Sequence, residues 1–264
     1  LEVTFLAKPI YGVAGSGEHT HFGISAWLKD GSRVNLFEPS DPDNDFMSPL
    51  GYGALMGLLK NYGLIYPIVA PTHDSFQRLK PGYEAPVCVV TSLGQDHQTP
   101  SRNRTVLVGL VRDRKNPLST RFELRSPNPH SNTYLVIGSV FRTMLDGIKA
   151  VLGAGRTPEE LERSISKKYG EEDFYLEKDR EYRSERDIFT DYTVEEREKL
   201  FGRAPANVWE SFLNWGDGGF DPARVVRITG GEESNEKTLR SYREQMILKW
   251  SMEYHDRYIP NTMD

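Results

Sequence analysis

The stretch DSFQRLKPGYEAP, residues Asp74–Pro86, is the part of this sequence around which the rest is best read. It combines an arginine, a tyrosine, a glutamate, two prolines and a glycine. The Pro-Gly pair is typical of a turn, and the last proline biases the residue before it toward extended backbone. We therefore expect a loop that is stiff at both ends and holds Arg78 and Glu84 at a fixed offset. The alternative is an ordinary solvated turn, since such turns are common.

Length and composition restrict the class of protein. The chain has 264 residues, of which 38% are apolar and 11% aromatic, so it can bury the core of a globular domain. A net charge of −5 gives no reason to expect nucleic acid or an anionic membrane as a partner. No apolar run approaches the roughly 20 residues of a membrane span, and no signal peptide is visible. The single Cys88 cannot form an internal disulfide, and we expect it to be buried in a cytoplasmic protein.

The start of the chain predicts strands and a glycine-rich loop. Val3–Ala7 has a strand pattern and no initiator methionine precedes it, so the sequence reads as a piece of something longer. A second strand is expected from Glu18 to Leu28, on which His19 and His21 share a face. The glycines before it could cradle a phosphate, but their spacing fits no nucleotide-binding fingerprint. The alternative is a hairpin with two half-exposed histidines.

Further strands are expected at Pro86–Ser92, Thr105–Val111 and Arg121–Arg125. The last of these alternates sharply, with two arginines and Glu123 on one face and two apolar residues on the other. By itself this pattern is also that of an amphipathic strand with a salt-bridged, solvated face.

Helices are expected where apolar residues recur at helical spacing. Ser48 and Pro49 form a helix start, and a long helix is predicted over Ser131–Leu152. The run Glu177–Asp187 alternates in charge and predicts a solvated helix, and the last helix is expected from Asn235 to Tyr254. The predicted core stripe of the long helix consists of Leu135, Ile137, Val140, Phe141, Met144, Leu145 and Ile148.

Three segments together resemble the glutamine synthetase family, in the family's order. Asp74–Pro86 is similar to that family's loop Asn-Ser-Tyr-Lys-Arg-Leu-x-Pro-Gly-Tyr-Glu-Ala-Pro. Lys8-Pro9 followed by Gly15–His21 resembles Lys-Pro and Gly-Ser-Gly-x-His-x-His. Arg102–Arg104 and Arg121–Pro129 resemble Arg-Asn-Arg and Arg-x-Glu-x-Arg-x-Pro-Asp-Pro. One such match would be weak evidence, but three in order are specific.

The resemblance implies an α+β fold with a curved, mostly antiparallel sheet backed by helices. It implies a single partial catalytic domain over residues 1–264, with the sheet and site in 1–153 and a mainly helical portion in 154–264. The implied reaction is ATP-dependent ligation of ammonia to glutamate through γ-glutamyl phosphate, with Mg²⁺ or Mn²⁺. The resemblance also implies a homo-oligomer in the intact protein and no turnover by residues 1–264 alone.

The same resemblance implies a role for each matching residue. His19 and Glu123 match metal ligands, and His21 matches a residue beside the nucleotide. Arg104 matches a catalytic arginine near the nucleotide's transferred phosphate. The glutamate substrate would be held by Gly15, Arg78 and Arg125, the arginines by the two-pronged geometry that suits a carboxylate. Glu84 matches the acid of a flap, which accepts a proton from the incoming ammonium.

Three positions depart from the family pattern. Ala14 stands for the usual asparagine, Gly23 for a serine and Gly109 for a second phosphate-binding arginine. Losing a cation from a phosphate site removes electrostatic stabilisation unless another group replaces it. These departures leave two alternatives open: a γ-glutamyl ligase for another amine, or a catalytically degenerate homologue that serves as a binding or regulatory subunit.

Overall fold

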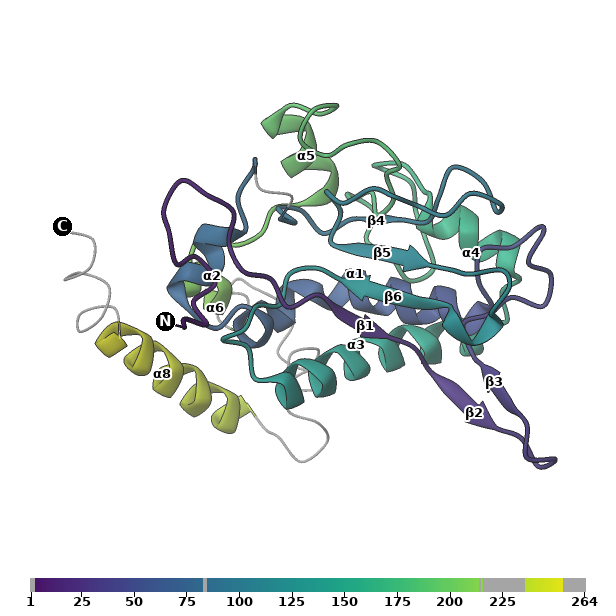
Figure 1. Cartoon of the computed structure of the whole chain (residues 1–264), viewed down its shortest axis with the longest axis horizontal. Coiled ribbons are helices and arrows are strands. Elements are labelled where there is room, and N and C mark those ends of the chain that lie inside the picture. The colour runs from purple at the N-terminus through teal and green to yellow at the C-terminus, as the bar shows by residue number, and fades with distance from the viewer. Residues whose placement is uncertain (1–2, 83–84, 214, 216–235, 254–264) are drawn as a thin grey trace.

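A four-stranded sheet positions the site in this computed structural model, which describes residues 3–82, 85–213, 215 and 236–253. Its strands lie in the order β1-β6-β5-β4, with antiparallel pairing except between β4 and β5. A separate antiparallel hairpin, β2-β3, projects from one end of the body (Figure 1). The strands are β1 Thr20–Phe22, β2 Ser25–Trp27, β3 Arg33–Asn35, β4 Thr91–Ser92, β5 Val108–Val111 and β6 Arg121–Leu124.

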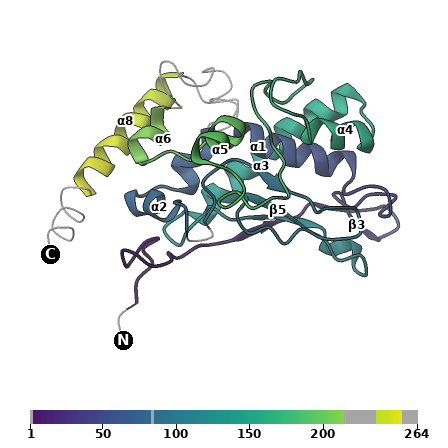
Figure 2. The ribbon, with the colours of Figure 1, turned by 90° about the horizontal axis from the view of Figure 1, so that it is seen from above.

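Helices cover one side of this sheet, as the view from above shows (Figure 2). The helices are α1 Pro49–Val69, α2 His73–Arg78, α3 Thr133–Ala154, α4 Pro158–Ile165, α5 Val194–Phe201, α6 Val208–Leu213 and α8 Glu236–Glu253, with a short 3₁₀ helix at Pro117–Ser119. The fold is therefore α+β with a mostly antiparallel sheet, as predicted. Within the described residues, no helix has both the length and the apolar character that crossing a membrane requires.

Alternation along the strands gives the sheet a core face and a site face. Phe122 and Leu124 of β6 are fully buried in the same core cluster as Val108 and Leu110 of β5. Glu123 lies between the two buried residues of β6 and is only half-buried. Because successive strand residues point to opposite faces, the helices cover the apolar face and the polar face stays open.

The main support of the sheet is a close pair of helices, α1 and α3. A Cβ placed at Gly57 of α1 would lie 3.0 Å from the Cα of Gly147 in α3. A Cβ at Gly53 would lie 2.9 Å from the Cα of Ile148. The glycines of α1, which lower helix propensity, are thus used for direct contact between two backbones.

This packing corrects the predicted core stripe of the long helix. Val140 and Met144 are buried as expected, but Leu135, Ile137, Phe141 and Leu145 are between 42% and 50% exposed. The buried face also includes the small residues Ser139, Thr143 and Gly147, which allow α1 to approach closely.

Several strands are shorter than predicted. Residues 3–6 form no strand, Pro86–Ser92 pairs only at Thr91–Ser92, and Thr105–Val111 pairs only from Val108. The predicted strand Glu18–Leu28 breaks at Gly23–Ile24, so that its second half leaves the sheet and forms the β2-β3 hairpin. The apolar runs at 86–92 and 105–111 identified buried segments, but ladder pairing covers only part of each run.

Two further predictions of local structure are wrong in an informative way. The Asp74–Arg78 part of the decisive stretch is helical, in α2, although the turn at Pro81-Gly82 forms with Gly82 at φ 95°. The charged run 177–187 is not a helix: it has a turn at 178–179 and a bend at 185–186, and Thr91 and Arg183 form a parallel bridge beside β4. Tyr182 and Ser184 are buried there, so tertiary contacts overrode the charge pattern.

Other expectations are confirmed. Ser48 caps α1, accepting a hydrogen bond from the backbone N–H of Gly51 at 3.1 Å. The last predicted helix exists as α8, although its ends at Asn235 and Tyr254 lie outside the described residues. Cys88 is buried, and burial raises the pKa of its thiol to about 12, which keeps the thiol protonated and unreactive at neutral pH.

Candidate active site

A row of residues crosses the site face of the sheet, one from each strand. The register pairs His21 with Glu123, Glu123 with Gly109, and Gly109 with Ser92. Residues that are directly opposite in neighbouring strands share a face. The row therefore brings one histidine and one carboxylate next to a position that has no side chain.

His19 and Glu123 converge at the centre of this face. The Nδ1 atom of His19 lies 2.9 Å from Oε1 of Glu123, and Nη1 of Arg125 donates to the same oxygen at 2.9 Å. Burial, and after it the positive charge of Arg125, lower the pKa of His19 below its ordinary value. His19 is therefore neutral at pH 7, and with Nδ1 donating to Glu123 its Nε2 carries the lone pair that a metal ion needs.

His21 is held by the neighbouring strand. Arg121 donates from Nε to Nδ1 of His21 at 3.0 Å, so Nδ1 is the accepting nitrogen. The two histidines share a face, as their spacing predicted, but they have different partners: a carboxylate for His19 and an arginine for His21.

Arg78 lies beneath the site and is only 4% exposed. Its Nη1 donates to the carbonyl oxygen of Ser126 at 2.8 Å and to that of Pro127 at 3.3 Å, and its Nη2 donates to the carbonyl oxygen of Arg125 at 2.9 Å. Burial, and then the charge of Arg125, lower the pKa of Arg78 to about 10, which still leaves it cationic at neutral pH. The guanidinium of Arg78 thus fixes the backbone that follows β6, including the backbone of Arg125 itself.

The glycine-rich segment makes room for this guanidinium. A Cβ added at Gly17 would lie 3.1 Å from Cζ of Arg78 and closer still to Nη2, and one at Gly15 would lie 3.0 Å from Cγ of Arg78. The backbone N–H of Ser16 donates to the carbonyl oxygen of Ala7 at 2.8 Å, which closes the loop over Arg78. These glycines serve a close approach between backbone and side chain.

Helix α2 joins all three of the segments that carry the family resemblance. The carboxylate of Asp74 accepts from the backbone N–H of Ala7 at 2.6 Å and of Lys8 at 3.3 Å. Ser75 Oγ accepts from Nδ2 of Asn128 at 2.8 Å. With the contacts of Arg78, the Asp74–Arg78 helix connects the first segment to the third, which explains why this stretch organises the chain.

A cavity of about 630 Å³ opens over this face. His19, Glu123 and Arg125 line it from the β1 and β6 side, while Gly109 and the segment from Ser101 to Arg104 line it from the other. A Cβ at Gly109 would meet nothing within 4 Å, so the missing side chain leaves open space in the cavity wall. Arg104 is exposed at its edge.

The donor set is suited in part to a divalent cation. Mg²⁺ and Mn²⁺ prefer oxygen ligands and commonly combine one or two carboxylates with substrate phosphates and water. His19 and Glu123 could supply one nitrogen and one carboxylate, with Arg125 and Arg104 positioned for anionic groups. Within the described residues, no group of three or more His, Cys, Asp or Glu side chains gathers around one point, so phosphate oxygens or further protein ligands would complete the coordination.

Some residues that the sequence did not single out contribute to the site, and one predicted residue cannot be assessed. Glu84 lies outside the described residues, so its predicted role is untested. Arg121 was identified from the sequence only as part of a motif, yet it donates a hydrogen bond to His21. Asn103, next to Arg104, donates to the carbonyl oxygen of Arg186, and Glu185 binds the backbone that follows β4. The alternation Arg-Asn-Arg could have indicated Asn103, whereas nothing local in the sequence points to Glu185.

Several known proteins are similar in sequence to this chain. The model of the glutamine synthetase catalytic domain matches residues 1–179. The glutamine synthetase of Sulfolobus acidocaldarius is 39% identical over 153 residues, which are 58% of this chain and 30% of that protein. Those of Clostridium saccharobutylicum and Thermotoga maritima are 38% and 37% identical, over 62% and 55% of this chain and 33% and 29% of theirs.

The chain spans about a third of the length of these relatives. The matched region contains the polar row of the sheet, helix α2 and the glycine-rich segment, the three parts that the contacts of Asp74 and Arg78 bring together. On this evidence the chain belongs to the glutamine synthetase family, through that family's catalytic domain.

Proposed function

We propose that this chain forms part of an ATP-dependent ligase that joins ammonia to glutamate through γ-glutamyl phosphate. The observation that carries the proposal is the convergence of His19 and Glu123, 2.9 Å apart, on a sheet face where Arg125 and Arg104 line the same cavity. Phosphoryl transfer is catalysed mainly by positioning and by electrostatic stabilisation, and this site offers both kinds of group.

His19 and Glu123 would hold Mg²⁺ or Mn²⁺. Such an ion, when bound, would offset the negative charge of the phosphates during transfer. His19 is preorganised for this role, since the hydrogen bond to Glu123 fixes its ring and its lowered pKa keeps it neutral. His21 would lie beside the nucleotide, and Arg104 would approach the transferred phosphate from the opposite edge of the cavity.

Glutamate would bind near Arg125, whose buried guanidinium borders the cavity and is oriented by Glu123. Arg78 supports this position through the carbonyl oxygens of residues 125–127, and its role as a direct carboxylate ligand stays a prediction. Gly15 as the contact of the substrate amino group and Glu84 as the general base for ammonium also stay predictions. A cytoplasmic homo-oligomer is proposed with the same function, on the family resemblance.

One observation favours a second candidate, the degenerate homologue. Gly109 occupies the row of site residues at the position where the family pattern carries a phosphate-binding arginine, and the space beside it is open. A chain without that cation could bind ligands weakly and act as a binding or regulatory subunit. A ligase for another amine would share the same phosphate and glutamate contacts.

The test of the metal site is the change Glu123→Gln. We expect Mn²⁺ affinity in the presence of ATP to fall at least about tenfold, because a neutral amide replaces the one carboxylate of the pair. Electron paramagnetic resonance of free Mn²⁺ measures it. Glu195→Gln, at an exposed position on α5, is the control for charge loss and should leave the affinity unchanged. Equal affinities in the wild type and Glu123→Gln would remove the metal site.

Gly109→Arg tests whether the missing cation limits nucleotide binding. The open space at Gly109 should accept the side chain, and we expect ATP affinity to rise by about tenfold, since one more charge-assisted contact adds roughly 1.5 kcal/mol. Gly109→Ala is the matched control for the loss of the glycine.

An activity assay of the full-length protein separates the proposed ligase from the degenerate homologue. With glutamate, ammonia, ATP and Mg²⁺, the ligase forms glutamine and the degenerate homologue does not.

A further inference from the structure

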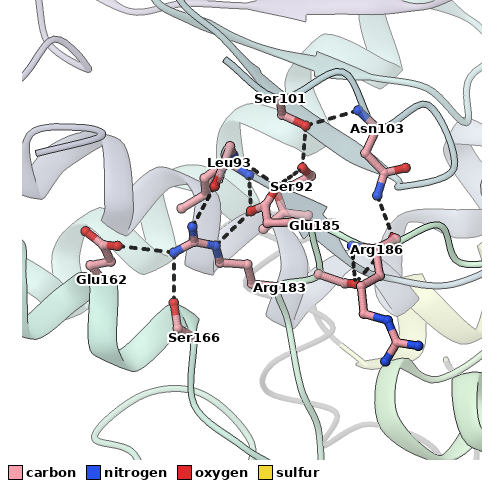
Figure 3. A network of polar contacts seen from close by, with 12 residues as sticks. Ser92, Leu93, Ser101, Asn103, Glu162, Ser166, Arg183, Glu185 and Arg186 are labelled. Atoms are coloured by element: carbon pink, nitrogen blue, oxygen red, sulfur yellow. Dashed lines mark hydrogen bonds and ion pairs between the residues drawn. The ribbon is translucent and has the colours of Figure 1, made fainter. Parts of the chain in front are cut away.

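The extended segment Tyr182–Arg186 lies outside the region that matches the family model, yet it joins the sheet beside the site. The backbone N–H of Thr91 donates to the carbonyl oxygen of Tyr182 at 2.8 Å, and that of Ser184 donates to the carbonyl oxygen of Thr91 at 2.9 Å. The segment thus adds one more backbone pairing beyond β4. Figure 3 shows the side chains that this pairing places over the end of the strand.

Glu185 is the centre of this network. Its Oε1 accepts from the backbone N–H of Leu93 at 3.0 Å, and its Oε2 accepts from that of Gly94 at 3.1 Å and from the hydroxyl of Ser92. Arg183 Nε adds a fourth donor at 2.9 Å (Figure 3). A single carboxylate therefore fixes the backbone where the chain leaves β4.

Arg183 anchors the carboxylate to the rest of the fold. Its Nη1 donates to Glu162 at 3.2 Å and to Ser166 at 3.0 Å, at the end of α4, and its Nη2 donates to the carbonyl oxygen of Gly94 at 2.9 Å. The Arg183 side chain is only 14% exposed, so its contacts are shielded from competing water. The pair Arg183–Glu185 thus ties α4 to the loop that follows β4.

The network continues to the Arg102–Arg104 segment. The hydroxyl of Ser92 contacts that of Ser101, which accepts from the backbone N–H of Asn103 at 3.2 Å. Asn103 Nδ2 donates to the carbonyl oxygen of Arg186 at 2.8 Å, and its Oδ1 accepts from the backbone N–H of Thr105 at 2.9 Å. Asn103 is therefore held by the Tyr182–Arg186 segment, while its two arginine neighbours are exposed and line the cavity.

We propose that Glu185 and Arg183 are positioning residues, which set the Arg102–Arg104 edge of the cavity and thereby the affinity for the nucleotide phosphates. The proposal rests on the proposed function, in that these arginines face a nucleotide. Long exposed arginine side chains bind a phosphate well only when the backbone that carries them is fixed. The residues act through Ser92, Ser101 and Asn103, and they touch no substrate themselves.

The test is Glu185→Gln, followed by ATP–Mg²⁺ titration calorimetry. The two carboxylate oxygens of Glu185 accept from the backbone N–H groups of Leu93 and Gly94, one each. Whichever way the glutamine amide is turned, its NH₂ group would face one of these two N–H donors, so the loop after β4 must shift. We expect the Kd for ATP to rise about tenfold or more, and the amides of residues 102–104 to exchange hydrogen faster than in the wild type. Glu195→Gln should change neither quantity.

The outcomes separate this inference from the proposed function. If the wild type binds ATP and Glu185→Gln binds it equally well, with unchanged exchange at 102–104, the positioning role is wrong and the proposed function stands. If the wild type binds no ATP, the proposed function fails, and with it the nucleotide role of Glu185. If Glu185→Gln does not fold, Ser101→Ala provides the test, because it removes only the link between Ser92 and Asn103. An unchanged Kd in that variant would overturn the proposal.

Discussion

Replacing Gly147 by alanine is expected to lower the free energy of unfolding by about 3 kcal/mol or more. The added Cβ would lie 2.7 Å from the Cα of Gly57 and closer still to the backbone N of that residue and to the carbonyl oxygen of Gly53. These neighbours are backbone atoms of α1, which cannot rotate away as a side chain can. The two helices that support the sheet would therefore have to separate.

Urea denaturation followed by circular dichroism measures this loss. Gly138→Ala is the matched control, because Gly138 lies on the same helix, is exposed, and has nothing within 4 Å of an added Cβ. This control should gain about 0.5–1 kcal/mol from helix propensity. Equal stabilities of the two variants would show that α1 and α3 are not packed as closely as described.

Arg78→Lys is expected to have the second large effect, on stability and on glutamate binding together. Lysine keeps the charge but cannot reproduce the planar fork that reaches three successive carbonyl oxygens, those of residues 125–127. Buried carbonyl groups without a donor are destabilising, so we expect a loss of about 3 kcal/mol. Since Arg125 is carried by the same backbone, glutamate should bind more weakly even where the variant is fully folded.

Denaturation and glutamate titration calorimetry of the variant, below its unfolding transition, measure the two effects separately. Arg33→Lys is the control: Arg33 is exposed on the β2-β3 hairpin, and its guanidinium donates to the hydroxyl of Ser25. It should change neither quantity. If Arg78→Lys is stable and binds glutamate normally, the guanidinium is dispensable for the turn after β6.

Local chemistry in the sequence was enough to predict several features of this protein. Alternation along Arg121–Arg125 predicted which side chains share the polar face, and the i, i+2 spacing of His19 and His21 placed both on one side. The cap at Ser48 and the turn at Pro81-Gly82 followed in the same way from residue chemistry. These features depend on interactions between residues close together in the chain, so the local sequence is enough to predict them.

Contacts between distant segments were decided only by the tertiary structure. Beside Val140 and Met144, the buried face of α3 carries the small residues Ser139, Thr143 and Gly147, because the close approach of α1 favours small side chains at the contact. The charged run 177–187 predicted a helix but pairs with Thr91, since buried partners for Arg183 and Glu185 outweigh the weak preference of a charge pattern. The motif around Arg78 indicated that this residue is important, but only the folded chain shows that its guanidinium donates to the carbonyl oxygens of residues 125–127. These hydrogen bonds join residues 47 to 49 positions apart, and the local sequence contains no signal for such contacts.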